Sequence, residues 1–157
     1  MSDTPAVLFV CLGNICRSPL AEGVFRHVAA EAGLDVVIDS AGTGGWHAGE
    51  PPDPRAIAVA RHHGVDIAHL RARQVRTADF ARFSHIYAAD HANLADLKGL
   101  RPAGAGTEPA LLLDLVAGRE GQALADPWYG DEAGFLDTWN DAMSAARALV
   151  ARLAQSG

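Results

Sequence analysis

The segment from Cys11 to Ser18 contains the residue types of a site that binds an anion and attacks it. It reads C-L-G-N-I-C-R-S, so an arginine stands six residues after a cysteine. Arginine donates two parallel hydrogen bonds to phosphate oxygens, a geometry that lysine cannot copy. Gly13 lets the backbone approach an anion closely, and Asn14 tolerates the positive φ of a tightly curled loop. The predicted phosphate-binding residues are Leu12, Gly13, Asn14, Ile15, Cys16, Arg17 and Ser18.

Cys11 is the predicted nucleophile of this loop. It follows an apolar strand pattern and precedes a helical pattern, and a helix N-terminus carries about half a positive elementary charge. This field and the Arg17 guanidinium both stabilise a thiolate, which is the reactive form of cysteine. Ser18 could add a hydrogen bond to the sulfur. We therefore predict covalent catalysis by Cys11 with Arg17 as the phosphate ligand, without a cofactor.

Cleavage of a phosphate monoester also needs an acid that protonates the leaving oxygen. Asp53 and Asp126 each precede a proline. Asp53 opens a helical pattern, where an N-cap explains it fully. Asp126 instead lies in a glycine-flanked loop beside Trp128 and Tyr129, whose rings could hold an aryl phosphate and partly desolvate the carboxyl. Asp126 is therefore the predicted general acid, which later serves as the base that activates water.

Other interpretations of the two cysteines are less favourable. Cys11 and Cys16 are too few for a disulfide framework, although they could be buried small side chains or form one disulfide. The seven histidines show no H-x3-H spacing and the cysteines no C-x2-C spacing, so no metal site is expected.

The nine residues C-L-G-N-I-C-R-S-P resemble the phosphate loop of the low-molecular-weight protein tyrosine phosphatases. The resemblance covers nearly the whole chain. It includes S-A-G-T-G-G-W-H at 40–47, H-L-R-A-R-Q at 69–74, the Asp90 and Asn93 pair, and the D-P motif followed by aromatic residues at Asp126.

The resemblance implies further roles for individual residues. It implies a hydrogen-bond network that holds the phosphate loop in shape, made of Asn14, Ser18, Ser40 and His69. It implies a substrate cleft walled by Trp46, Trp128 and Tyr129. It also implies that Cys16 forms a reversible disulfide with Cys11 and so protects the nucleophile from over-oxidation. The expected substrates are phosphotyrosine-containing proteins.

Three related functions compete with this interpretation. Thioredoxin-coupled arsenate reductases use further cysteines downstream, and this chain has none after Cys16. Protein arginine phosphatases typically carry threonine where this chain has Ile15, and an apolar branched residue favours phosphotyrosine over a phosphoguanidinium. A silent phosphoprotein-binding module would need neither Cys11 nor Asp126, and both are present.

Strand and helix patterns alternate along the chain. Residues 7–10 form a continuous apolar run typical of a central parallel strand. Later strands are expected at 36–40, 85–88 and 111–113. Helices are expected at 18–33 with Ser18 as N-cap, at 53–64, at 77–83 with Thr77 as cap, at 93–97, and at 135–153, with a loop at 99–109. This order predicts one domain over residues 1–157, an α/β three-layer sandwich with a central, mostly parallel four-stranded sheet and helices on both faces.

Composition limits the partners and the location. The chain has one lysine and twelve arginines, and its net charge is −6. It therefore lacks the basic excess of a nucleic-acid binder. An acidic body repels anions, so an anion site must be built from local dipoles and a specific arginine. No membrane-length apolar run and no secretory signal are present. We expect a cytoplasmic, bacterial protein, monomeric or weakly dimeric, whose partners include a bacterial tyrosine kinase.

Overall fold

The computed structural model describes residues 4–127 and 132–156 and contains a four-stranded parallel sheet. The strands are β1 (Ala6–Cys11), β2 (Val37–Gly42), β3 (His85–Ala88) and β4 (Ala110–Leu111), in the spatial order β2-β1-β3-β4. Every residue of β1 is buried, because this strand pairs with β2 on one side and with β3 on the other. The predicted parallel sheet is confirmed.

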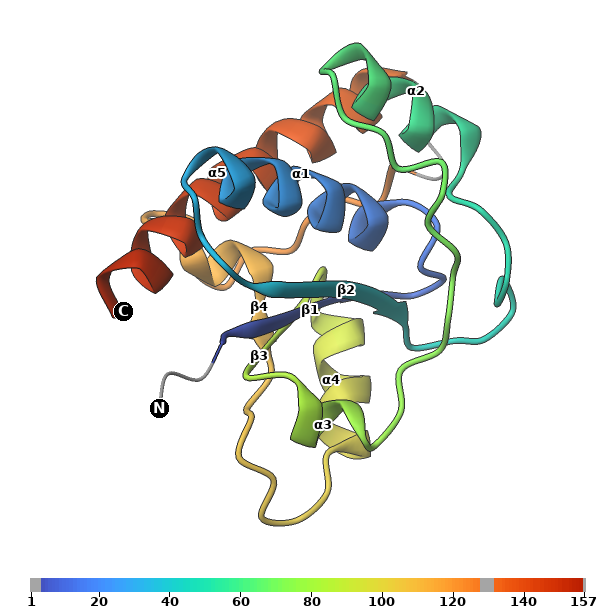
Figure 1. The fold of residues 1–157 in the computed structure, drawn as a ribbon. Coiled ribbons are helices and arrows are strands. Elements are labelled where there is room, and N and C mark those ends of the chain that lie inside the picture. The colour runs from blue at the N-terminus through green and yellow to red at the C-terminus, as the bar shows by residue number, and fades with distance from the viewer. Residues whose placement is uncertain (1–3, 128–131, 157) are drawn as a thin grey trace.

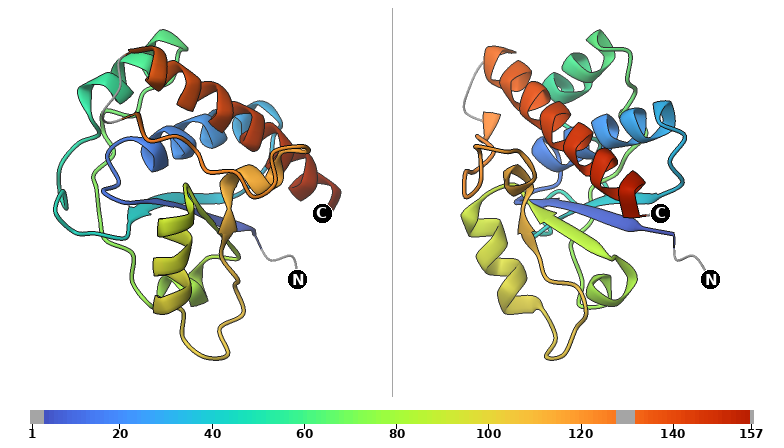
Figure 2. Two further views of the ribbon diagram at one scale, coloured as in Figure 1. Left: turned by 180° about the vertical axis from the view of Figure 1, so that it is seen from behind. Right: turned by 90° about the vertical axis from the view of Figure 1, so that its left-hand side faces the viewer.

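Helices cover both faces of the sheet, as Figures 1 and 2 show. The helices α1 (Arg17–Glu31), α2 (Pro54–His62) and α5 (Glu132–Ser156) lie on one side. The short helix α3 (Asp79–Arg82) and α4 (His91–Leu100) lie on the other. Side chains of β1 alternate between the two faces: Val7 and Phe9 join the core under α1 and α5, and Leu8 joins the core with α3 and α4. The three-layer sandwich is thereby confirmed.

The sheet order places the loop after β1 at a ligand-binding position. In open parallel sheets, ligands bind beyond the carboxyl ends of strands, where neighbouring connections leave in opposite directions. The chain leaves β1 through α1 to reach β2 on one side, and β3 flanks β1 on the other. Cys11 is the last residue of β1 and pairs with Gly42 at the end of β2. The nucleophile predicted from sequence therefore stands at this edge.

Several element ends differ from the prediction for local reasons. Helix α1 begins at Arg17 with Cys16 as its N-cap, not at Ser18, because the Ser18 hydroxyl binds other side chains. Thr77 does not cap α3, whose N-cap is Ala78; the Asp79 carboxylate instead accepts from the Arg76 N–H, 2.8 Å away.

Two further ends differ in the second half of the chain. The apolar run at 111–113 is mostly not a strand: after β4, the chain turns into a 3-10 helix (η1) at Leu112–Leu115. Helix α4 is longer than the predicted 93–97, because the Asp90 carboxylate caps it from the start. Asp53 is the N-cap of α2, as predicted. No helix within the described residues is long and apolar enough to cross a membrane.

Candidate active site

Asn14 sets the shape of the loop between β1 and α1. Its φ is 58°, the only positive φ among the described non-glycine residues. Its side-chain Oδ1 accepts from the Arg73 N–H at 3.0 Å, and its Nδ2 donates to Ser18 Oγ at 2.8 Å and to Ser40 Oγ at 3.0 Å. The left-handed backbone is thus held by three hydrogen bonds from one side chain. Asn14, Ser18 and Ser40, three residues of the predicted network, are therefore joined by hydrogen bonds.

Cys11 lies under this loop and its side chain receives two polar contacts. Cys11 is 3% exposed. Its Sγ lies 3.0 Å from Ser18 Oγ, and the Asn14 N–H donates to it at 3.3 Å. These contacts hold the sulfur in position under the loop. The start of α1, with its unpaired backbone N–H groups, follows directly.

Arg17 is buried and its guanidinium is held from behind. Its Nη1 donates to Asp90 Oδ2 at 2.9 Å and to the Leu124 carbonyl at 3.0 Å. Asp90 also caps α4 by accepting from the Asn93 N–H at 2.8 Å. Arg17 Nη2 lies 3.6 Å from Asp126 Oδ2. The guanidinium is therefore fixed in orientation before any anion arrives.

One cavity joins the three predicted catalytic residues. Its volume is about 210 Å³. Cys11 and Arg17 are buried, whereas the Asp126 side chain is 40% exposed. The complete lining is Cys11, Leu12, Gly13, Ile15, Cys16, Arg17, Trp46, His47 and Asp126. Cys11 and Asp126, which are 115 positions apart in the chain, thus meet at one site.

Trp46 borders the cavity as predicted. It is 72% exposed, yet its ring lies against the backbone of Gly44, where a Cβ would come within 1.8 Å of the ring. The glycine is therefore what allows the ring to lie there. His47, which the sequence argument did not single out, also borders the cavity, with Nδ1 3.1 Å from a Glu50 carboxylate oxygen. The other predicted wall residues, Trp128 and Tyr129, lie outside the described residues.

Cys16 borders the same cavity but differs chemically from Cys11. It is 5% exposed. Burial, and after it the negative charge of Asp53 and the proximity of Cys11, raise the pKa of Cys16 to about 12. Cys16 is therefore a neutral thiol at physiological pH.

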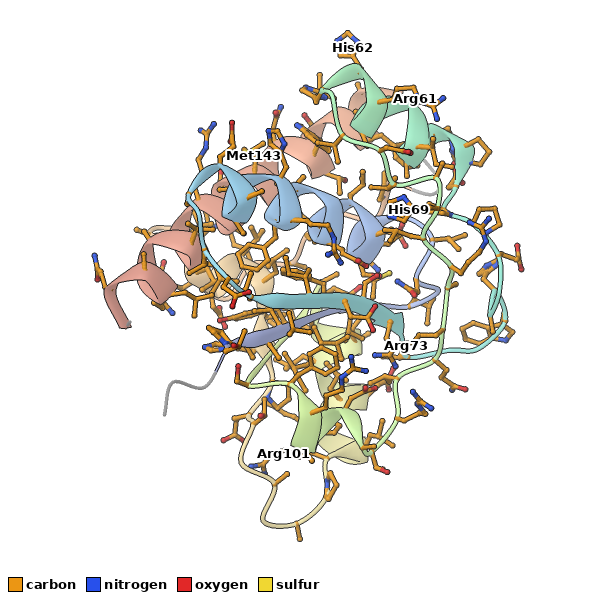
Figure 3. All side chains as sticks on the ribbon, in the orientation of Figure 1. Arg61, His62, His69, Arg73, Arg101 and Met143 are labelled. Atoms are coloured by element: carbon orange, nitrogen blue, oxygen red, sulfur yellow. The ribbon has the colours of Figure 1, made fainter. Side chains whose placement is uncertain are left out.

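The structure does not bring His69 to the other residues of the predicted loop network. His69 is exposed and borders a second cavity together with Gly23 and Arg26 (Figure 3). The backbone N–H of Arg73, four residues further along the chain, is what binds Asn14 Oδ1.

Two residues that the sequence argument missed complete the network. Glu22 is 3% exposed, and its Oε1 accepts from Ser40 Oγ at 2.6 Å. Arg73 supplies the backbone N–H for Asn14, while its guanidinium pairs with Asp39 at 3.1 Å and Asp79 at 3.0 Å (Figure 3). Glu22 had a signal in the sequence, because it is a carboxylate within the otherwise apolar stretch 20–25. The described residues contain no group of three or more His, Cys, Asp or Glu side chains placed to hold a metal ion.

Comparison with known proteins agrees with this geometry. Residues 6–157 match the family described as low molecular weight phosphotyrosine protein phosphatase. A protein of that name from Schizosaccharomyces pombe is 42% identical over 142 residues, which cover 88% of this chain and 90% of that protein. A crystal structure of a protein tyrosine phosphatase from Entamoeba histolytica is 32% identical, with a TM-score of 0.92 over 98% of this chain and 99% of that one. The Drosophila arginine phosphatase is 28% identical, with a TM-score of 0.88 over 94% and 96% of the two chains.

Proposed function

The chain belongs to the low molecular weight phosphotyrosine protein phosphatase family, and because it does, we propose that it hydrolyses phosphotyrosine in proteins through a cysteinyl-phosphate intermediate. One observation carries the proposal: a buried cysteine with two polar contacts to its sulfur, a fixed guanidinium and a carboxyl group border one cavity. Binding alone would need neither the nucleophile nor the acid.

The first half of the reaction transfers the phosphoryl group to the enzyme. The loop N–H groups and Arg17 hold the phosphate oxygens. The Cys11 thiolate attacks phosphorus in line, so a sulfur–phosphorus bond forms while the bond from phosphorus to the phenolic oxygen breaks. Asp126 gives its proton to that oxygen, and tyrosine leaves neutral. The 3.6 Å between Arg17 Nη2 and Asp126 Oδ2 supports this role, because Arg17 is the proposed phosphate ligand.

The second half returns the enzyme to its starting state. Asp126, now a carboxylate, takes a proton from water while the water oxygen attacks phosphorus. The sulfur–phosphorus bond breaks, inorganic phosphate forms and Cys11 leaves as a thiolate. Ser18 Oγ, 3.0 Å from the sulfur, stabilises the charge that returns to it.

The walls of the cavity support an aryl substrate. Leu12, Ile15 and Trp46 present apolar surface in this cavity, which suits an aromatic ring. A phosphoguanidinium would place polar N–H groups against the same surface, and Ile15 offers them no hydrogen bond. This residue therefore favours phosphotyrosine, although an arginine phosphatase shares the fold.

We also propose that Cys16 is the redox partner of Cys11. A peroxide would oxidise the Cys11 thiolate to a sulfenic acid. The Cys16 sulfur would then attack the oxidised sulfur, forming the disulfide and releasing hydroxide, which takes up a proton to leave as water. The support is that both cysteines border one cavity and lie on one loop.

The setting of this activity is proposed from composition. Residues 1–157 would act as a single domain in the cytoplasm of a bacterium, as a monomer or weak dimer, without a cofactor. Its protein substrates would include a bacterial tyrosine kinase. No nucleic-acid partner is expected from a chain with a net charge of −6.

The test of the proposed function uses the variant Cys11→Ser. We expect it to abolish turnover of an aryl phosphate while binding of inorganic phosphate persists, because the loop and Arg17 remain. Asp126→Asn should slow hydrolysis most for esters with poor leaving groups, since these need the proton. Steady-state kinetics with a series of substituted phenyl phosphates, in the presence of a chelator, measure the turnover of Cys11→Ser and the leaving-group dependence of Asp126→Asn.

Two outcomes would contradict this assignment. Activity of Cys11→Ser comparable with that of the unaltered chain would exclude the covalent mechanism. Turnover of matched peptides containing phosphotyrosine or phosphoarginine tests the substrate class, and a preference for phosphoarginine would overturn the inference from Ile15.

A further inference from the structure

The buried carboxylate of Glu22 has a cation from the protein surface as its partner. Glu22 Oε2 accepts from Arg26 Nη2 at 2.8 Å, one helical turn further along α1. Their side chains differ greatly in exposure, 3% for Glu22 and 52% for Arg26. The same Arg26 nitrogen donates to the Ile38 carbonyl of β2 at 2.9 Å. A carboxylate is costly to bury unless a positive charge pairs with it, and Arg26 supplies that charge.

A chain of hydrogen bonds links Glu22 to Cys11 through three other side chains, and the donor of each bond can be assigned. A backbone N–H can only donate, so the bond from Arg73 identifies Oδ1 of Asn14 and places Nδ2 against the two serines. Ser40 accepts from Asn14 and therefore gives its own proton to Glu22, 2.6 Å away.

The same reasoning fixes the proton of Ser18. Because Ser18 Oγ accepts from Asn14 Nδ2, its own proton is available to an acceptor. Two acceptors are near: Cys11 Sγ at 3.0 Å and the Ala41 carbonyl at 3.4 Å. The shorter contact directs the proton to the sulfur. In this relay, Glu22–Ser40–Asn14–Ser18–Cys11, Ser40 depends directly on Glu22 being an acceptor, and Asn14 donates to both serines.

We propose that Arg26 is a positioning residue for the reaction, which acts on Cys11 through this relay by holding the Glu22 carboxylate in place as the acceptor for Ser40. This inference rests on the proposed phosphatase function. Without Arg26, the Glu22 side chain would lose the ion pair that fixes its position against Ser40. Ser40 would then have no buried acceptor for its own proton, and the Asn14 amide that fixes the loop would lose its alignment.

A purely stabilising ion pair on the surface of α1 makes a different prediction, so the two can be separated. The experiment compares Arg26→Gln, which removes the charge, with Arg26→Lys, which retains it. Glu22→Gln and the double variant complete a mutant cycle. Arg61→Gln is the matched control, because Arg61 is an exposed arginine on the neighbouring helix α2 (Figure 3).

Turnover of an aryl phosphate is the first measurement. We expect Arg26→Gln to lower kcat about tenfold while KM changes less than about twofold, because the effect falls on the nucleophile and not on phosphate binding. Arg26→Lys should recover most of the loss. In the Glu22→Gln background, Arg26→Gln should add less than about a twofold change. Melting temperatures of all variants verify that each is folded at the assay temperature.

Alkylation of Cys11 by iodoacetamide, followed by mass spectrometry, is the second measurement and requires no turnover. The rate at Cys11 should fall about threefold or more in Arg26→Gln and recover in Arg26→Lys, because alkylation needs the thiolate. If the unaltered chain failed to hydrolyse aryl phosphates, the proposed function would be wrong, while the alkylation rates would still report on Arg26.

Either of two results would overturn the role of Arg26. One is a folded Arg26→Gln variant whose kcat and Cys11 alkylation rate match those of Arg61→Gln. The other is an equal loss from Arg26→Gln with and without Glu22→Gln, which would show that Arg26 does not act through Glu22.

Discussion

Asn14 shows how much of this site depends on a single side chain. Its amide has one acceptor and two donor hydrogens engaged, with partners on β2, α1 and the segment before α3. Together these bonds hold a backbone conformation that most side chains avoid. The loop is therefore shaped in advance, and an arriving phosphate does not have to order it.

The two cysteines should differ sharply in their response to pH. In the Cys11→Ser variant, alkylation of Cys16 should rise about tenfold per pH unit from about pH 7 to about pH 10 without levelling off, because only the thiolate reacts. The direction follows from the raised pKa of about 12, below which Cys16 is protonated. Iodoacetamide labelling quantified by mass spectrometry measures the slope. Asp53→Asn should increase the rate at each pH, since it removes a negative charge.

A plateau near the ordinary thiol range would contradict this prediction. It would mean that Cys16 ionises as readily as an exposed cysteine. Disulfide formation with Cys11 would then be fast at neutral pH, whereas a protonated Cys16 makes it slow and increasingly fast in alkali.

The residues of the site were predictable from sequence to different degrees. Cys11 and Arg17 are adjacent in the chain to the elements that orient them, so local spacing sufficed. His69 was assigned by resemblance, but it is exposed, and the Arg73 N–H donates to Asn14 Oδ1. Glu22 and Arg73 were missed because their contacts join elements 18 to 59 residues apart, and such contacts exist only after folding.

At the scale of elements, Asp90 connects a helix end to Arg17, the proposed phosphate ligand. One carboxylate oxygen caps α4 and the other holds Arg17. The start of a helix on one face of the sheet is thus tied to the first residue of α1 on the opposite face. This shared anchor explains why the guanidinium remains fixed although no backbone of α4 reaches the cavity.

Substitution by alanine should change the stability of the protein in opposite directions at two glycines, one just after α2 and one within α4. Gly64, just after α2, has a φ of +81°, so Gly64→Ala should destabilise the protein by about 1 kcal/mol. Gly99 lies within α4, lacks a positive φ and has open space where a Cβ would stand. Gly99→Ala should therefore stabilise by up to about 1 kcal/mol. Thermal unfolding should show melting temperatures moved about 2–4 °C in opposite directions.

The comparison of the two glycines isolates backbone conformation, because neither has an atom within 4 Å of the added carbon. A loss of stability in both variants, or a gain in both, would contradict the assignment. Kinetics should remain unchanged in either case, since both positions lie outside the cavity lining.

Elements buried on both faces were the easiest to predict. The apolar run of β1 and the strand at 85–88 agree with the structure, because continuous burial leaves a strong pattern. The run at 111–113 is equally apolar, yet only Ala110 and Leu111 pair with β3. Three leucines bury well in a strand or in a 3-10 turn, so composition could not decide between them.

At the scale of the whole molecule, the negative net charge opposes the substrate that the site attracts. The net charge of −6 repels anions at long range. Within the cavity, the loop N–H groups and Arg17 are instead donors for an anion. Long-range repulsion is screened by salt, but contacts inside a cavity are much less affected.

Salt should therefore change the selectivity between phosphopeptides. Raising NaCl from about 20 to about 200 mM should increase kcat/KM for a phosphotyrosine peptide flanked by acidic residues and decrease it for one flanked by basic residues. The change should be roughly twofold to threefold in each direction and should appear in KM more than in kcat. The amount of phosphate released from each peptide at fixed reaction times measures this salt dependence. Equal salt dependence for both peptides would show that the overall charge does not steer substrates.

Leu124 connects Ala89, which follows β3, to the Arg17 side chain through its own backbone atoms. Its N–H donates to the Ala89 carbonyl at 2.7 Å, and its carbonyl accepts from Arg17 at 3.0 Å. Asp126 follows two residues later. Main-chain contacts do not depend on side-chain identity, so the residues that follow Asp126 can diverge or be grafted from a relative while the Asp126 carboxyl stays aligned with the guanidinium. Evolution and protein engineering can thus vary which targets are accepted without rebuilding the chemistry.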